Sequence, residues 1–142
     1  MVNRDVVINK VQTIERCLRR IEEEYDQNPE NLQSFTKQDA IVLNLLRACE
    51  ASIDLAMHVI SQMQWDVPQT SREAFTILSD KNIINQKLAK RLQGMVGFRN
   101  IAVHNYQTLN LTILKEIIEH HLHDFKDYAE IMIRLYQRMD QL

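Results

Sequence analysis

The chain has 142 residues, a formal net charge of -2 at pH 7, 45% hydrophobic residues and 25% charged residues. This length suits one domain with a substantial core, so we expect a single domain over residues 1–142. A net charge near zero excludes nucleic-acid binding through bulk charge, so any such contact must come from a local basic patch. The chain holds only two glycines and two prolines, which predicts few turns and long helices.

The two cysteines, Cys17 and Cys49, form no motif, and both lie at apolar helical positions. Isolated thiols of this kind usually behave as small buried hydrophobic residues. We therefore expect no disulfide framework and a cytoplasmic protein. The N-terminal segment is charged and lacks an apolar stretch, and no run of about 18 apolar residues follows, so neither a signal peptide nor a membrane span is expected.

Apolar residues at alternating steps of three and four predict a first helix over residues 3–26, followed by a polar loop at 28–36. The second helix is expected over 37–64, with Ser34 or Thr36 as its cap. This second helix is apolar on most of its sides. Such a helix lies at the centre of a bundle or in an interface between subunits.

Three further helices complete the expected fold. A short helix is predicted over 71–79, and long helices are predicted over 83–103 and 110–140. No strand pattern, repeat or low-complexity tract competes with this assignment. The predicted fold class is therefore all-α, a bundle of four long helices and one short helix. The regular three- and four-residue steps favour near-parallel packing with knobs-into-holes contacts.

The most informative segment is Phe98-Arg99-Asn100-Ile101-Ala102-Val103-His104-Asn105-Tyr106. Arginine is a natural binder of phosphate, and histidine is the side chain best able to move a proton near neutral pH. Together, Arg99 and His104 can hold a phosphodiester and cleave it without a metal. In this reaction, a ribose 2'-hydroxyl attacks its neighbouring phosphate. His104 acts as general base or acid, and Arg99 neutralises charge on the phosphoryl oxygens.

Helical geometry constrains how these groups can cooperate. If the helix continues, Asn100 and His104 lie one turn apart on one face, where Asn100 can orient the imidazole. Gly97 shares this face and leaves room for another backbone or a substrate. Arg99 and His104 are about 140° apart around the helix, an awkward arrangement for one phosphate. Either the helix loosens after Arg99, or two copies meet about a two-fold axis. We favour the second, because the apolar surface of the second helix exceeds the needs of one core.

A polar strip on the second helix carries Glu50, Asp54 and His58, spaced four residues apart on one face. We expect Glu50 and Asp54 to support the site by orienting Arg99 or His104, and His58 to be structural. The alternative is a strip satisfied by water or by neighbouring helices.

Two other groups of polar residues have competing interpretations. On one continuous helix, His120 shares a face with His123 or Asp124, whereas His121 falls on the apolar seam. Two ligands rarely make a stable structural site, so no metal is expected there. A basic group can steer a phosphate backbone toward the motif or form an ordinary solvated face. Its members are Arg47, Lys87, Lys90 and Arg91.

The segment from Arg99 to Tyr106 matches the RNxxVHxY signature of the HEPN superfamily and resembles the HepT toxins in particular. The second helix from Leu45 to His58, the chain length, the helix order and the Gly-Phe before Arg99 resemble the same family. The resemblance therefore covers nearly the whole chain. It implies a HEPN-like fold and a homodimeric, metal-independent endoribonuclease whose RNA-binding cleft forms where two protomers meet.

The resemblance also implies a partner and a modification. In a type VII toxin–antitoxin pair, an MntA-type minimal nucleotidyltransferase antitoxin would transfer AMP from ATP to Tyr106. The added charge and bulk beside Arg99 and His104 would mimic substrate and exclude RNA. The nuclease itself is expected to need no cofactor. Two alternatives remain open: a non-catalytic helical partner that presents substrates to a nucleotidyltransferase, and a dimeric scaffold whose Arg and His make structural hydrogen bonds.

Overall fold

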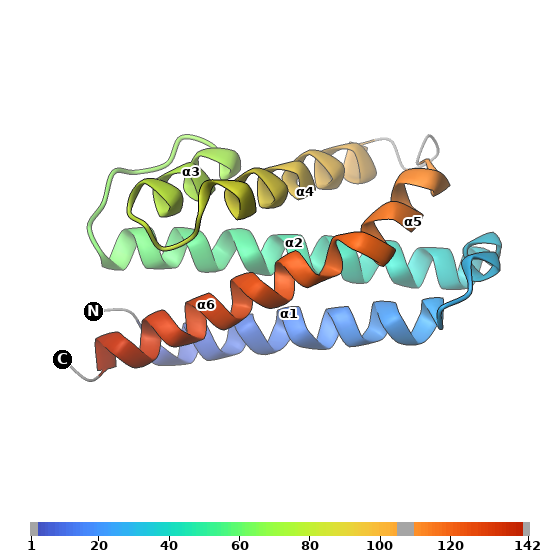
Figure 1. The fold of residues 1–142 in the computed structure, drawn as a ribbon, viewed down its shortest axis with the longest axis horizontal. Helices are drawn as coiled ribbons and strands as arrows, with labels where there is room; N and C mark the ends of the chain where they lie inside the picture. Colours follow the sequence, from blue (N-terminus) through green and yellow to red (C-terminus); the bar gives the residue numbers. More distant parts are fainter. Residues whose placement is uncertain (1–2, 105–109, 141–142) are drawn as a thin grey trace.

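The computed structural model describes residues 3–104 and 110–140, and for residues 103, 104, 139 and 140 it describes the backbone alone. Helices and short connections make up the described chain, and no strand occurs within it (Figure 1). In chain order the elements are α1 (Arg4–Tyr25), the 3-10 helix η1 (Pro29–Gln33), α2 (Phe35–Gln62), α3 (Ser71–Asp80), α4 (Gln86–His104), α5 (Leu111–His120) and α6 (Leu122–Asp140).

The first four expected helices are confirmed, each with limits within three residues of those predicted. Polar side chains set where they begin, because the first N–H groups of a helix lack intrahelical partners. Ser34, one of the two expected caps, accepts the N–H of Lys37 at 3.3 Å. At the start of α4, the Oδ1 of Asn85 accepts the N–H of Leu88 at 2.7 Å.

The prediction of one helix over 110–140 is wrong, because the chain bends at His121 and forms two helices, α5 and α6. His121 has φ -126° and ψ -3°, and its N–H closes α5 by donating to the carbonyl of Ile117. The apolar seam continues across the bend through buried Ile118 and Phe125, so residue spacing alone does not reveal it. The side chain of His121 is 37% exposed rather than buried on the seam.

Helix α2 lies at the centre of the bundle, with α1 and α6 on one side and α3 and α4 on the other (Figure 1). This position explains why α2 is apolar on most of its sides: Ile41, Leu45, Leu55 and Val59 are all at most 1% exposed. The wide apolar surface of α2 is therefore largely covered within one chain. It does not by itself require a second copy, contrary to the reason given above for favouring a two-fold contact.

The described helices place the motif at one end of the bundle. The end of α4, the start of α5 and the start of α2 all lie at this end, opposite the two termini of the chain (Figure 1). None of the described helices is both long enough and apolar enough to span a membrane.

Candidate active site at the end of helix α4

Arg99 is held by polar partners on two helices. Its Nη1 forms an ion pair with the Oε1 of Glu50 on α2. Its Nε and Nη2 donate to the Oδ1 of the neighbouring Asn100 at 3.3 and 2.9 Å. The side chain is 22% exposed, so the guanidinium remains accessible to a ligand. The structure thus brings together three predicted site residues, and the carboxylate and amide fix the direction of the Arg99 fork.

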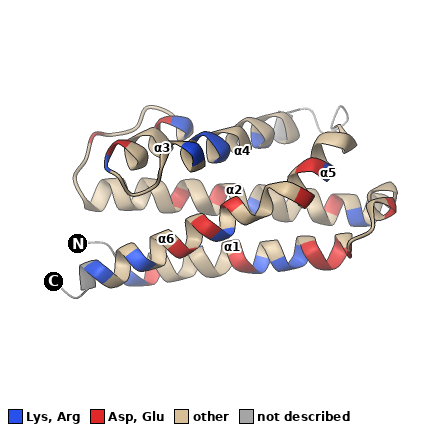
Figure 2. Cartoon of the chain, in the orientation of Figure 1, with Lys and Arg blue, Asp and Glu red and all other residues tan. Residues whose placement is uncertain are grey.

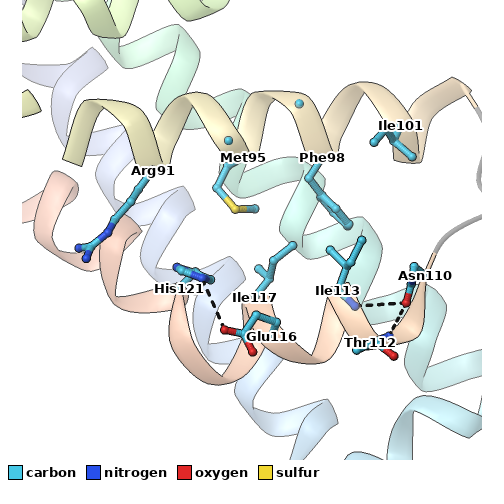
Figure 3. A pocket seen from close by; sticks show the side chains of 12 residues that line it. Arg91, Met95, Phe98, Ile101, Asn110, Thr112, Ile113, Glu116, Ile117 and His121 are labelled. Carbon is cyan, nitrogen blue, oxygen red and sulfur yellow. Dashed lines mark hydrogen bonds and ion pairs between the residues drawn. The ribbon is translucent and has the colours of Figure 1, made fainter. Parts of the chain in front are cut away.

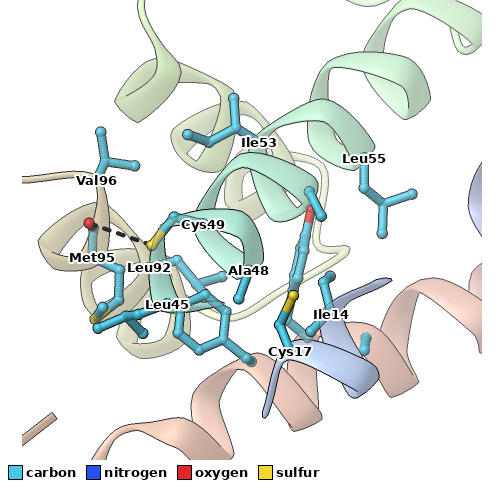
Figure 4. Packing of buried hydrophobic residues seen from close by; sticks show 14 of the residues in the cluster. Ile14, Cys17, Leu45, Ala48, Cys49, Ile53, Leu55, Leu92, Met95 and Val96 are labelled. Atoms are coloured by element: carbon cyan, nitrogen blue, oxygen red, sulfur yellow. Dashed lines mark hydrogen bonds between the residues drawn. The ribbon is translucent and has the colours of Figure 1, made fainter. Parts of the chain in front are cut away.

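Close packing of α2 against α4 keeps Glu50 opposite Arg99. The neighbouring Cys49 is 2% exposed, and its Sγ lies 3.7 Å from the carbonyl oxygen of Met95 on α4 (Figure 4). Burial raises the pKa of the Cys49 thiol to about 12, so it stays protonated at neutral pH. A protonated, buried thiol is inert, and Cys49 acts as a packing residue. Cys17 is likewise free and buried, which confirms the expectation for both cysteines.

Helix α4 continues without a break through Arg99 and ends at His104. The first of the two geometric alternatives, a helix that loosens directly after Arg99, is therefore excluded. The backbones of Arg99 and His104 remain about 140° apart around one helix. The side chain of His104 and the whole of Tyr106 lie outside the described residues, so the expected Asn100–His104 contact remains a prediction.

The remaining members of the polar strip on α2 contact α1 and the residue before it. The carboxylate of Asp54 forms an ion pair with the Nζ of Lys10 at 3.1 Å. The Nε2 of His58 accepts a hydrogen bond from the N–H of Asn3 at 3.1 Å, which links α2 to the residue that caps α1. Glu50 is thus the member of the strip that the structure brings to Arg99. The supporting role of Asp54 at the site remains a prediction.

Comparison with known proteins decides the family. Residues 14–132 match the family described as ribonuclease HepT-like. The chain belongs to this HepT-like family. It is 48% identical over 128 residues to the mRNA nuclease HepT of Shewanella oneidensis, covering 90% of this chain and 96% of that protein. It is 28% identical over 106 residues to the tRNA nuclease HepT of Aphanizomenon flos-aquae, covering 74% of this chain and 72% of that protein.

A solved structure agrees with the fold of this HepT-like chain. The tri-AMPylated Shewanella oneidensis HEPN toxin, in complex with MNT antitoxin, superimposes with a TM-score of 0.88 at 46% identity. The match covers 93% of this chain and 99% of that one. The expected family and the HEPN-like, all-α fold are therefore confirmed.

The histidine cluster of this HepT-like chain surrounds a buried carboxylate at the bend between α5 and α6. Asp124 is 0% exposed, and its carboxylate lies 3.4 Å from the Nδ1 of His121 and 3.2 Å from the Nε2 of His123. His123, Asp124 and Asp127 have ligand atoms within 4.8 Å of one another. The Nη1 of Arg91 lies 3.3 Å from the Oδ1 of Asp124. The positive charge of Arg91 would repel a metal ion at this oxygen.

The proposed basic group does not act as one unit. Figure 2 shows Lys and Arg gathered on the first turns of α4, where Lys87 and Lys90 are exposed. Arg91 is engaged with Asp124, and Arg47 is exposed on α2. Residue spacing did not identify Arg72 on α3, which contacts α4 beside the motif. A contact between separate helices leaves no periodic signal in either one.

Replacing Glu50 with Gln is expected to lower kcat for RNA cleavage about tenfold, because loss of the ion pair frees Arg99 to move and small misplacements are costly. The free energy of unfolding should change by less than about 1 kcal/mol, since the pair is partly exposed. Steady-state kinetics and urea unfolding measure both quantities. The control is Glu130→Gln, which breaks an exposed ion pair with Arg134 on α6. An unchanged kcat in Glu50→Gln would show that this carboxylate does not position Arg99.

His58 is expected to make folding stability depend on pH. Burial lowers the pKa of His58 from 6.5, so below that pH the unfolded chain binds the proton more readily than the folded chain. The stabilisation is complete above about pH 6.5 and is lost as pH falls through the lowered folded-state pKa. Urea unfolding between pH 8 and 5 should therefore show a shallower loss of stability in His58→Gln than in the unsubstituted protein. Equal slopes would contradict this assignment.

Proposed function

We propose that this protein is the ribonuclease toxin of a toxin–antitoxin pair. The observation that carries the proposal is the intact motif from Arg99 to Tyr106 in a HepT-like chain, with the Arg99 guanidinium held in place and still accessible. The similar proteins from Shewanella oneidensis and Aphanizomenon flos-aquae are named as mRNA and tRNA nucleases, which supports RNA as the substrate class.

The chemistry assigned to the site needs no metal. A ribose 2'-hydroxyl attacks the adjacent phosphorus, forming a new P–O bond and breaking the bond to the 5'-oxygen of the next nucleotide. His104 accepts the hydroxyl proton or donates one to the departing oxygen. Arg99 stabilises the charge that grows on the phosphoryl oxygens. The products are a 2',3'-cyclic phosphate and a 5'-hydroxyl, and DNA is inert because it lacks the attacking group.

The cleft is assigned to a homodimer. Because α4 is continuous through His104, the backbone positions of Arg99 and His104 lie about 140° apart around one helix, whereas a two-fold contact brings a second set of both residues. Beside the motif, α4 and α5 enclose an apolar hollow of about 800 Å³ (Figure 3). Ile101 and Ile113 line this hollow and are 55% and 52% exposed. Large exposed apolar side chains around a hollow are typical of an interaction surface, which supports dimerisation here.

Neutralisation is assigned to AMP transfer. A solved structure similar to this chain is described as a tri-AMPylated toxin in complex with MNT antitoxin. In this chain the acceptor is Tyr106, two residues after His104 in the sequence. Its hydroxyl attacks the α-phosphorus of ATP and pyrophosphate leaves. The attached phosphodiester then places negative charge close to Arg99 and competes with RNA.

The proposed activity is tested with unmodified protein made by cell-free synthesis. The protein is incubated with tRNA and with mRNA in the presence of a chelator, and the new ends are identified. Cleavage that leaves 2',3'-cyclic phosphate ends supports the proposal. Absence of cleavage in both RNAs would contradict it and favour a non-catalytic partner of a nucleotidyltransferase.

A further inference from the structure

Gly97 on α4 lies against the Arg72 side chain of α3. A Cβ atom at this position would lie 2.6 Å from the Nη2 of Arg72, so the guanidinium rests against the bare backbone of α4. The missing side chain of Gly97 predicts the approach of a backbone or a substrate. In the structure, the group that lies against Gly97 is the guanidinium of Arg72, the second residue of α3.

The same arginine faces a cavity that it shares with the motif. This cavity has a volume of about 330 Å³, and its lining includes Arg72 and Ser71 from α3 and Arg99 and Asn100 from α4. The Arg99 side chain bonds back to Asn100, which follows Gly97 by three residues on the same side of the helix. Two arginine residues therefore line one small cavity, and two positive charges at one cavity favour the binding of an anion.

Arg99 and Arg72 differ in their hydrogen-bond and ion-pair partners. Arg99 is bonded to Glu50 and Asn100. The Arg72 side chain makes no hydrogen bond or ion pair within the part of the chain that the structure describes. The N-terminus of α3 is already capped, since the Oγ1 of Thr70 accepts the N–H of Glu73 at 3.1 Å. The group at this cavity that is left without a protein partner in the described chain is therefore the exposed Arg72 side chain, not the helix terminus.

We propose that Arg72 binds a second phosphate of the RNA backbone, next to the scissile phosphate held by Arg99. This inference rests on the ribonuclease function proposed above. Arginine suits the task because its planar fork can donate two parallel hydrogen bonds to a phosphate. Gly97 belongs to the same phosphate-binding site, because only a residue without a side chain lets the Arg72 guanidinium lie against α4. Arg72 thus sets substrate affinity and register, while bond cleavage belongs to Arg99 and His104.

The test uses a short RNA with one scissile bond, in which each flanking phosphate in turn is replaced by a neutral methylphosphonate. For the unsubstituted protein, one flanking replacement should raise KM about tenfold, the cost of losing one charge-assisted hydrogen bond. Arg72→Gln should raise KM about tenfold on the all-phosphate RNA, with kcat within about twofold. With Arg72→Gln, the methylphosphonate at that one RNA position should cause no further rise in KM. For Arg72→Gln, the slope of log KM against log salt concentration should also be smaller by about 0.7.

Two glycine variants provide a matched pair. Gly97→Ala should displace the Arg72 guanidinium and raise KM on the all-phosphate RNA while removing no charge. Gly94→Ala introduces a Cβ that meets nothing within 4 Å in the described chain and leaves Arg72 in place; because both glycines line the hollow between α4 and α5, it controls for an added methyl group there, and its KM should be lower than that of Gly97→Ala. Both changes replace glycine inside a helix and should raise the unfolding temperature, so a KM effect confined to Gly97→Ala is not a folding defect. Arg19→Gln, which removes an exposed charge from α1, controls for net charge.

The outcomes separate this inference from the function on which it rests. If Arg72→Gln cleaves the all-phosphate RNA with unchanged KM, or if the methylphosphonate that weakens binding by the unsubstituted protein weakens binding by Arg72→Gln equally, Arg72 binds no second phosphate and the nuclease assignment stands. If the unsubstituted protein cleaves no RNA, the proposed function fails and this inference fails with it.

Discussion

Replacing Arg99 with Ala is expected to lower kcat for RNA cleavage by about 100- to 1,000-fold, the usual cost of removing one donor that stabilises transition-state charge. The fold should survive, because the side chain is partly exposed and pairs with a partly exposed Glu50. His104→Ala should cost on the order of 100- to 10,000-fold, through loss of proton transfer. In cells, either change should abolish the growth arrest that the unsubstituted toxin causes.

Arg99→Lys distinguishes charge from geometry. Lysine keeps a cation but lacks the planar fork, so kcat should fall less than in Arg99→Ala and stay well below that of the unsubstituted protein. Circular dichroism and thermal unfolding confirm that each variant is folded, and Arg19→Gln serves as an exposed arginine control. Full activity in folded Arg99→Ala would leave only the scaffold interpretation of the motif.

Mixing the two inactive proteins tests whether the cleft is shared between subunits. If each site takes Arg99 from one protomer and His104 from its partner, a mixed dimer regains one complete site. After subunit exchange, half of the dimers are mixed, so about a quarter of the activity should return. If no RNA cleavage returns, Arg99 and His104 act from the same protomer, or each site needs Arg99 and His104 from both protomers.

Replacing Tyr106 with Phe is expected to make the toxin resistant to its antitoxin. The phenylalanine ring has no hydroxyl to accept AMP, so co-expression with a nucleotidyltransferase antitoxin should no longer relieve growth arrest. Unsubstituted toxin purified with its partner should carry one or more AMP units, and the modified form should lose RNA cleavage because phosphate charge lies beside Arg99. Intact mass measurement and nuclease assays on the same samples check both statements.

A second tyrosine provides the control for this experiment. Tyr136 lies on α6 and is partly buried, and Tyr136→Phe should be modified and neutralised like the unsubstituted toxin. Persistent AMP on the Tyr106→Phe variant would place the acceptor elsewhere. Neutralisation of that variant without any adduct would mean that the antitoxin blocks the cleft by binding alone.

Much of the fold could be predicted because each helix buries one regular stripe. Val11, Ile14 and Leu18 on α1 are all at most 4% exposed, as their spacing predicts. The bend at His121 could not be predicted this way, since Ile118 and Phe125 keep helical spacing on both sides of it. What marks the bend is tertiary: the buried carboxylate of Asp124 contacts Arg91 from α4.

The functional site, like the fold, could be predicted from the sequence only where it depends on neighbouring residues. The sequence placed Arg99, Asn100 and His104 in one segment, because local spacing and the family signature both concern neighbouring residues. It placed Glu50 and Asp54 on one polar face as supporting residues but could not show that Glu50 is the one that pairs with Arg99, because the ion pair joins residues 49 positions apart. Arg72 carries no sequence signal at all. Its relevance depends on the absence of a side chain at Gly97 on another helix.

The measurement that tests the central claim most directly is cleavage, in chelator, of a short RNA whose scissile nucleotide carries either a 2'-hydroxyl or a 2'-hydrogen. Cleavage of the hydroxyl substrate alone, with a cyclic phosphate identified by mass spectrometry, is the result expected from Arg99 and His104 acting on one phosphate. Cleavage of the 2'-deoxy bond, or activity that appears only when a divalent metal is restored, would contradict the account.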